Sequence, residues 1–223
     1  MSEPRLTESL IQSLGEQLTP VRRLPPPWLR TAAWLLAVSA VAGWLLMHYG
    51  ATGMLHRWNS DPDLALAGIG AVMTAVCAAW AAFALGVPGR PAGWAWLPLP
   101  TALLWIGASG MGCLREWGVA AASAASAQEG SSCLVFIISF SVPLSVVLIW
   151  LLRRACPLRP VLTAVMIGLA SAAASAALLE ICHAAGAAAS DLAMHALAVA
   201  IVVTINAALG GRLLQPALKY STR

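Results

Sequence analysis

The stretch LLEICHAAG, residues 178–186, places three chemically versatile side chains inside a segment that is otherwise mostly Ala and Leu. Glu180, Cys182 and His183 fall within four positions of one another, and His195 follows further along the chain. Carboxylate, thiolate and imidazole groups all bind metals, and a thiolate can also form a disulfide. This pattern suits either a metal site or a redox-active thiol, and the choice depends on the elements that position these residues.

The composition indicates an all-α integral membrane protein. Of the 223 residues, 60% are hydrophobic and only 10% are charged, whereas soluble domains contain about 25% charged residues. A membrane-spanning helix needs about 20 mostly apolar residues. Strands are not expected, because the apolar runs are long and do not alternate with polar residues. We predict six transmembrane helices, at 29–50, 64–87, 93–113, 133–152, 161–182 and 192–214.

The distribution of positive charge predicts the orientation. If the N-terminus is cytoplasmic, all but two of the 13 Lys and Arg residues lie on the cytoplasmic side, the exceptions being Arg57 and Arg115. This satisfies the positive-inside rule and places both termini in the cytoplasm. The first 28 residues lack the apolar core of a signal peptide, so no cleavage is expected. We attribute the net charge of +4 to membrane topology and anionic lipid, with no direct nucleic-acid binding.

This topology brings three cysteines, Cys113, Cys133 and Cys182, to the outer ends of spans. Glu180 and His183 lie at the same level, and His195 lies about one turn inside the sixth span. In an oxidising compartment two of these thiols could form a disulfide, or thiolates and imidazole could bind a thiophilic cation. The alternatives are structural: a small apolar filler for a cysteine, an interfacial acid for Glu180 and a carbonyl-bonded His195.

The polar N-terminal segment predicts an amphipathic helix with one apolar stripe, formed by Leu6, Leu10, Ile11, Leu14 and Leu18. The opposite face carries Glu8 and Glu16, whereas helices that lie on membranes favour Lys and Arg there. We therefore favour a protein partner over docking on lipid or on the bundle itself. The prolines at 25–27 form a stiff spacer, followed by Trp28 as an interfacial anchor.

The chain resembles a known family, the negative regulators of sigma factor F, which are six-span membrane anti-sigma factors. The resemblance rests on LIQSLGEQLTPVRRLPPPWLR (residues 10–30), DPDLALAGIGAVMTAVCAAWAAF (61–83) and the segment 132–186. It implies a cytoplasmic sigma-factor-binding segment at 1–28, a bundle at 29–214 and a short cytoplasmic tail at 215–223, in a bacterial inner membrane. The implied partner is an extracytoplasmic-function sigma factor, released in response to heavy-metal or redox stress.

The same resemblance implies that Cys133 and Cys182 are the sensing thiols, while Cys113 lies outside the family pattern. His183, Glu180, His195 and Cys113 are then accessory ligands, and no cofactor is expected beyond a transient heavy-metal ion at the thiols. The sequence lacks Walker, HExxH and GxSxG motifs, so we expect no enzyme. Two alternatives are a small transporter or metal exporter, and a membrane thiol oxidoreductase.

Overall fold

The computed structural model describes residues 3–16, 24–116, 124–153, 155, 157–182 and 189–214. The described residues form helices and connecting segments, with no strand among them. The elements are α1 (Glu3–Glu16), α2 (Pro27–Tyr49), α3 (Thr52–Ser60), α4 (Pro62–Leu85), η1 (Ala92–Trp96), α5 (Leu99–Glu116), α6 (Ala124–Leu152), α7 (Pro160–Cys182) and α8 (Ala189–Leu213).

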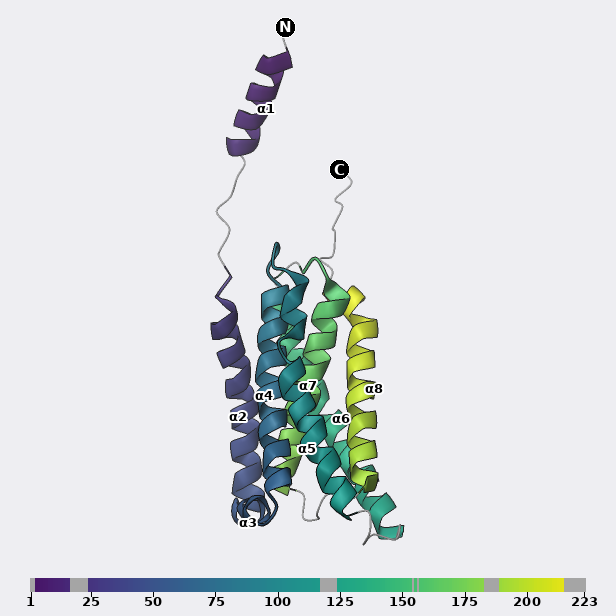
Figure 1. The fold of residues 1–223 in the computed structure, drawn as a ribbon. Coiled ribbons are helices and arrows are strands. Elements are labelled where there is room, and N and C mark those ends of the chain that lie inside the picture. Colours follow the sequence, from purple (N-terminus) through teal and green to yellow (C-terminus); the bar gives the residue numbers. More distant parts are fainter. Residues whose placement is uncertain are drawn as a thin grey trace.

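The long helices α2, α4, α5, α6, α7 and α8 run side by side as one bundle (Figure 1). Helix α2 begins and α8 ends at the same end of the bundle, which we call the head end because α1 lies beyond it (Figure 1). The short helix α3 lies at the opposite end, which we call the far end (Figure 1). The predicted N-terminal segment contains helix α1, Glu3–Glu16, and Leu18 of its predicted stripe lies outside the described residues.

Five helices of the described chain are long and apolar enough to cross a membrane. They are α2, α4, α7, the Ser132–Leu152 part of α6 and the Ala193–Gly210 part of α8. The observed α2, α4, α7 and α8 match the predicted segments to within three residues at each end. The all-helical class is therefore confirmed with five candidate spans, and α5 is not one of these five.

The predicted continuous span at 93–113 is instead divided into η1 and α5. Pro98 and Pro100 have no backbone N–H, so neither can donate to the carbonyl four residues earlier. The Leu97 N–H donates to the Trp94 carbonyl at 3.2 Å, a tighter turn that closes η1 before α5 begins. Helix α6 also differs from the prediction, because it begins at Ala124 rather than at 133.

Helix ends coincide with residues that favour them. Pro27 occupies the first turn of α2, where its missing N–H costs nothing. At the start of α4, the Asp61 carboxylate accepts a hydrogen bond from the Asp63 backbone N–H at 3.0 Å, and Pro62 follows Asp61. Gly50 ends α2 with a positive φ of 75°, a conformation that favours glycine.

Helix α7 is the centre of the bundle, in contact with α2, α4, α6 and α8. In its most apolar 18-residue stretch, 72% of the residues are buried, against 17% for α8. Small residues allow this packing: a Cβ on Gly168 would lie 2.8 Å from the Val203 Cα of α8. Likewise, a Cβ on Gly70 of α4 would lie 2.9 Å from the backbone of Trp105 in α5. The helices α7 with α8, and α4 with α5, are thus tightly packed pairs.

Candidate functional site

The apolar stripe of α1 is exposed. Leu10, Ile11 and Leu14 have exposed fractions of 58%, 59% and 55%. Leu6 lies within α1 but its side chain is outside the described residues, as is the whole of Leu18. A helix of 14 residues gains little stability by itself in water. An exposed apolar stripe on such a helix suits a groove in a partner protein.

The segment that joins this helix to the bundle ends in an extended conformation. Pro26 has φ of −60° and ψ of 153°, as in a polyproline II helix, and Pro27 starts α2 directly after it. Trp28 is 57% exposed at the start of α2. The stiffness of these prolines limits how freely the preceding chain can move relative to α2.

Arg30, one turn into α2, is almost fully buried with an exposed fraction of 4%. Its Nη2 donates to the Leu151 carbonyl oxygen at 2.9 Å, and its guanidinium lies 4.6 Å from the centre of the Phe83 ring. Leu151 is in the last turn of α6, whose carbonyls lack donors within the helix. Arg30 therefore caps α6 from a neighbouring helix, and the partial negative charge of that helix end stabilises the cation.

A second hydrogen bond joins the same two helices closer to the middle of the bundle. The Trp34 indole Nε1 donates to the Leu144 carbonyl oxygen at 3.2 Å, and Trp34 is completely buried. Leu144 follows Pro143, the proline within α6, which removes one backbone N–H from that helix. Helix α6 is thus anchored to α2 on the head side of its proline.

The two predicted sensing thiols lie in different environments. Cys133 is 1% exposed and packs with Ile137, Ala176 and Leu179. Cys182, in the last turn of α7, is partly exposed, and its Sγ is 3.9 Å from the Leu178 carbonyl oxygen. Both are thiols rather than members of a disulfide. Cys133 belongs to one apolar cluster and Cys182 packs against another, and their shared role as sensing thiols remains a prediction.

A metal site built from several ligands is not formed in the described part of the chain. No group of three or more His, Cys, Asp and Glu side chains there is arranged to hold a metal ion. His183 lies outside the described residues, and for Cys113 only the helical backbone within α5 is described. The prediction that these two residues are accessory ligands therefore remains a prediction.

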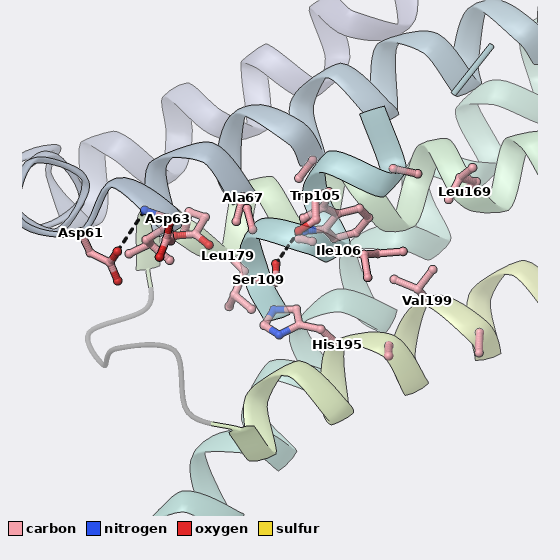
Figure 2. Close-up of a pocket in the computed structure, with 18 of the residues that line it drawn as sticks. Asp61, Asp63, Ala67, Trp105, Ile106, Ser109, Leu169, Leu179, His195 and Val199 are labelled. Carbon is pink, nitrogen blue, oxygen red and sulfur yellow. Dashed lines mark hydrogen bonds between the residues drawn. The ribbon is translucent and has the colours of Figure 1, made fainter. Parts of the chain in front are cut away.

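Glu180 and His195, the other two predicted accessory ligands, line one cavity of about 570 Å³. The cavity lies among α4, α5, α7 and α8, with Trp105 and Ile106 on the α5 side and His195 and Val199 on the α8 side (Figure 2). Leu169 marks its deeper, apolar end (Figure 2). Ligand pockets typically measure about 300–1,000 Å³ and combine apolar walls with a few polar groups, and this cavity fits that description.

The polar groups gather toward the far end of the cavity. Asp61 and Asp63 of the α4 start, Glu180 of α7 and Arg57 of α3 all line it. The Arg57 Nη2 donates to the Glu180 backbone carbonyl at 2.6 Å. That carbonyl is in the last turn of α7 and lacks a donor within the helix. Arg57 therefore caps the end of α7 that carries Cys182.

Polar side chains in the interior of the bundle bind one another. The Ser141 hydroxyl of α6 and the Ser175 hydroxyl of α7 are 3.1 Å apart. The Asn206 amide of α8 donates to the Ser145 hydroxyl of α6 at 3.3 Å. These contacts join α6 to both α7 and α8, as interhelical hydrogen bonds commonly do in membrane bundles.

Sequence analysis did not identify Arg57, Asp61, Asp63 or Trp105 as members of a site. In the structure Asp61 caps the start of α4, and Pro62 follows it in the first turn. Helix α3 has only nine residues, which is too short for a clear helical pattern of apolar residues. The contact of Arg57 with α7 could therefore not be predicted from the sequence. The cavity is lined by residues from several helices, so it depends on how the helices pack and cannot be read from any one segment of the sequence.

A family model described as "Negative regulator of sigma F" matches residues 14–215 of the chain. The match includes the bundle, both thiols and the cavity, whereas most of α1 precedes it. No curated protein and no solved structure matches the chain.

Proposed function

Because the chain belongs to the family of negative regulators of sigma F, we propose that it is a membrane-bound anti-sigma factor for an extracytoplasmic-function sigma factor. Negative regulation of a sigma factor, with that sigma factor as partner, follows from the family. The kind of sigma factor, the way it is held and the signal that releases it are our proposals. The protein acts by binding and has no catalytic step of its own.

The observation that supports this proposal best is the exposed stripe of α1. Leu10, Ile11 and Leu14 are each more than half exposed on a helix beyond the head end of the bundle. Burial of an apolar side chain stabilises an interface by about 1.5–3 kcal/mol relative to leaving it in water. The acidic residues Glu8 and Glu16 on the remaining surface of α1 disfavour docking on an anionic membrane.

The proposed orientation puts the head end in the cytoplasm of a bacterium and the far end outside its inner membrane. Arg90, Arg153 and Arg159 belong to connections at the head end, as the positive-inside rule requires for cytoplasmic loops. We count α5 as the sixth span, because it lies along α4 within the bundle. Both termini are then cytoplasmic, and the apolar outer surface of the bundle contacts lipid.

We further propose that Cys133 and Cys182 control release. Cys133 is 1% exposed, so a metal ion or oxidant reaches its sulfur only after α6 separates from α7. Reaction at Cys133 therefore traps a bundle state that is otherwise rarely populated. The two thiolates then bind one thiophilic cation transiently. Alternatively, the two sulfurs form a bond, with two electrons and two protons passing to the oxidant.

Helix α6 is the proposed route from these thiols to the head. Cys133 lies on the far side of Pro143, and Leu151, on the other side, accepts the hydrogen bond from Arg30. Arg30 is three residues after Pro27, where the stiff prolines end. A movement of α6 thus alters the anchor of the segment that carries α1. A tenfold change in affinity for the sigma factor requires only about 1.4 kcal/mol of difference between the two states.

Co-purification from membranes tests this account. The chain is expressed with a candidate extracytoplasmic-function sigma factor from the same genome, as wild type, as Cys133→Ser with Cys182→Ser, and without residues 1–24. Wild type should retain sigma factor and release it on exposure to cadmium or oxidant, and the double mutant should retain it under both conditions. The truncated chain should not bind.

Two outcomes would contradict parts of this account. Retention of sigma factor by the truncated chain would contradict the role of α1. Release from the double mutant would leave the anti-sigma activity in place but refute the sensing role of these two thiols. A Cys77→Ser variant is the matched control, because Cys77 is a partly buried thiol within α4 and away from the proposed pair.

A further inference from the structure

The cavity that reaches the far end is lined by both charged and apolar side chains, and the proposed anti-sigma function does not use it. It is bounded by two tightly packed helix pairs, α4 with α5 and α7 with α8. Close approach at Gly70 holds α5 against α4, and close approach at Gly168 holds α8 against α7. Helix α4 of one pair packs on α7 of the other, whereas α5 and α8 have little contact, and the cavity occupies the space between α5 and α8 (Figure 2).

The polar end of this cavity is rich in carboxylates. Three carboxylates, those of Asp61, Asp63 and Glu180, line it together with one guanidinium, that of Arg57. Carboxylates therefore outnumber guanidinium groups among the residues that line the cavity. The Arg57 guanidinium already donates to the Glu180 carbonyl oxygen, which is part of the cap of α7. An anion would therefore face carboxylates and an arginine that is already engaged.

The remaining walls suit an apolar body. Trp105, Ile106, Leu169 and Val199 face the space beyond the acidic end (Figure 2). The face of a Trp ring attracts cations, and charge interactions are stronger next to apolar walls than in water. A hydrated metal ion would leave the apolar part of this cavity of about 570 Å³ unfilled.

We propose that this cavity binds a lipophilic monocation, with the positive centre next to Asp63 and Glu180 and the apolar body between α5 and α8. Binding requires no sigma factor, so this inference stands or falls independently of the proposed function.

The test compares two ions of nearly the same shape and opposite charge. Radiolabelled tetraphenylphosphonium and tetraphenylborate are each equilibrated by dialysis against the protein in phosphatidylcholine nanodiscs, and binding to empty nanodiscs is subtracted. We expect saturable binding of one tetraphenylphosphonium per chain. Tetraphenylborate should show no saturable binding above the lipid background.

Two variants locate the binding. Ala200→Trp fills the cavity from α8 at an exposed position, and Glu180→Gln with Asp63→Asn removes two of its charges. Each should weaken tetraphenylphosphonium binding at least about tenfold, equivalent to 1.4 kcal/mol. The matched controls are Ala208→Trp, also exposed on α8 but outside the cavity, and Glu8→Gln with Glu16→Gln on α1. Both controls should bind as wild type does.

Three results would overturn the proposal: no saturable binding of the cation, equal affinity for the two ions, or unchanged binding by Ala200→Trp. Circular dichroism and thermal unfolding of each variant show whether it is folded. If the double charge variant does not fold, Glu180→Gln alone is used, because it retains the Asp63 carboxylate at the start of α4.

Discussion

The guanidinium of Arg30 and the carbonyl oxygen of Leu151 are joined by a hydrogen bond of 2.9 Å, which connects the first turn of α2 to the last turn of α6. At the other end of the bundle, Arg57 makes the equivalent contact with the last turn of α7. The helices that carry the two proposed sensing thiols therefore both end in a carbonyl capped by an arginine from another element. Both caps are polar contacts that help to hold the C-terminal ends of α6 and α7 in place.

Replacement of Arg30 should loosen the head end of α6. Arg30→Met preserves much of the apolar length but removes the donor and the cation over Phe83. A hydrogen bond to a charged group contributes about 1.5–3 kcal/mol, so we expect a comparable loss in the free energy of unfolding. Thermal or denaturant unfolding in detergent measures it. The control is Arg159→Met, an exposed arginine at the same end, and an equal loss there would contradict the capping role.

Replacement of Arg57 should expose the end of α7. In Arg57→Met the Glu180 carbonyl loses its donor, so the last turn of α7 should open more often. Cys182 lies in that turn, and its alkylation by a maleimide should become faster, while labelling of Cys77 remains unchanged. Arg57→Lys, which retains a donor, should show a smaller effect. An unchanged rate for Cys182 in Arg57→Met would argue against the cap.

The two proposed sensing thiols should differ in reactivity. Cys133 is 1% exposed and Cys182 is partly exposed, so a maleimide should label Cys182 first in a chain that lacks the other cysteines. Each 1.4 kcal/mol needed to open the packing around Cys133 slows its labelling about tenfold. Leu179→Ala removes a packing neighbour and should raise the rate at Cys133. Equal labelling rates for the two thiols in these chains, without the Leu179→Ala change, would contradict the buried position of Cys133.

The interior hydrogen bond between Asn206 and Ser145 should make a modest contribution to stability. Asn206→Leu removes the amide that joins α8 to α6. Interhelical hydrogen bonds in membranes contribute about 0.6 kcal/mol on average and up to about 1.7, so the expected loss lies in that range. Thr204→Val, an exposed position on the same helix, is the matched control. A loss of unfolding free energy in the control but not in Asn206→Leu would refute this assignment.

Much of the fold follows from the length of the apolar segments. A run of about 20 apolar residues has few alternatives to a helix in lipid, because every backbone amide must be bonded within the segment. This is why the predicted ends of α2, α4, α7 and α8 agree closely with the structure. The run at 93–113 departs from the prediction because Pro98 and Pro100 interrupt the helix that hydropathy alone would continue.

The candidate sites were less predictable, because they depend on how helices pack. Glu180 and His195 were identified individually, but the cavity that they share also requires α3 to present Arg57 and α4 to begin at Asp61 and Pro62. No local pattern indicates that Cys133 faces the interior while Cys182 remains accessible. The α1 stripe, in contrast, follows from a four-residue repeat of Leu within one helix, and needs no tertiary information.

The most direct test of the central claim is the affinity of the sigma factor for single-site variants of α1. Leu14→Asp places a charge in the middle of the exposed stripe, and Gln12→Asp places the same charge on the opposite face of the helix. Truncation of a central apolar residue in an interface costs about 2 kcal/mol or more, so Leu14→Asp should weaken sigma-factor binding at least about thirtyfold. Gln12→Asp should bind as wild type does. Equal binding by wild type and both variants would show that α1 does not hold the sigma factor.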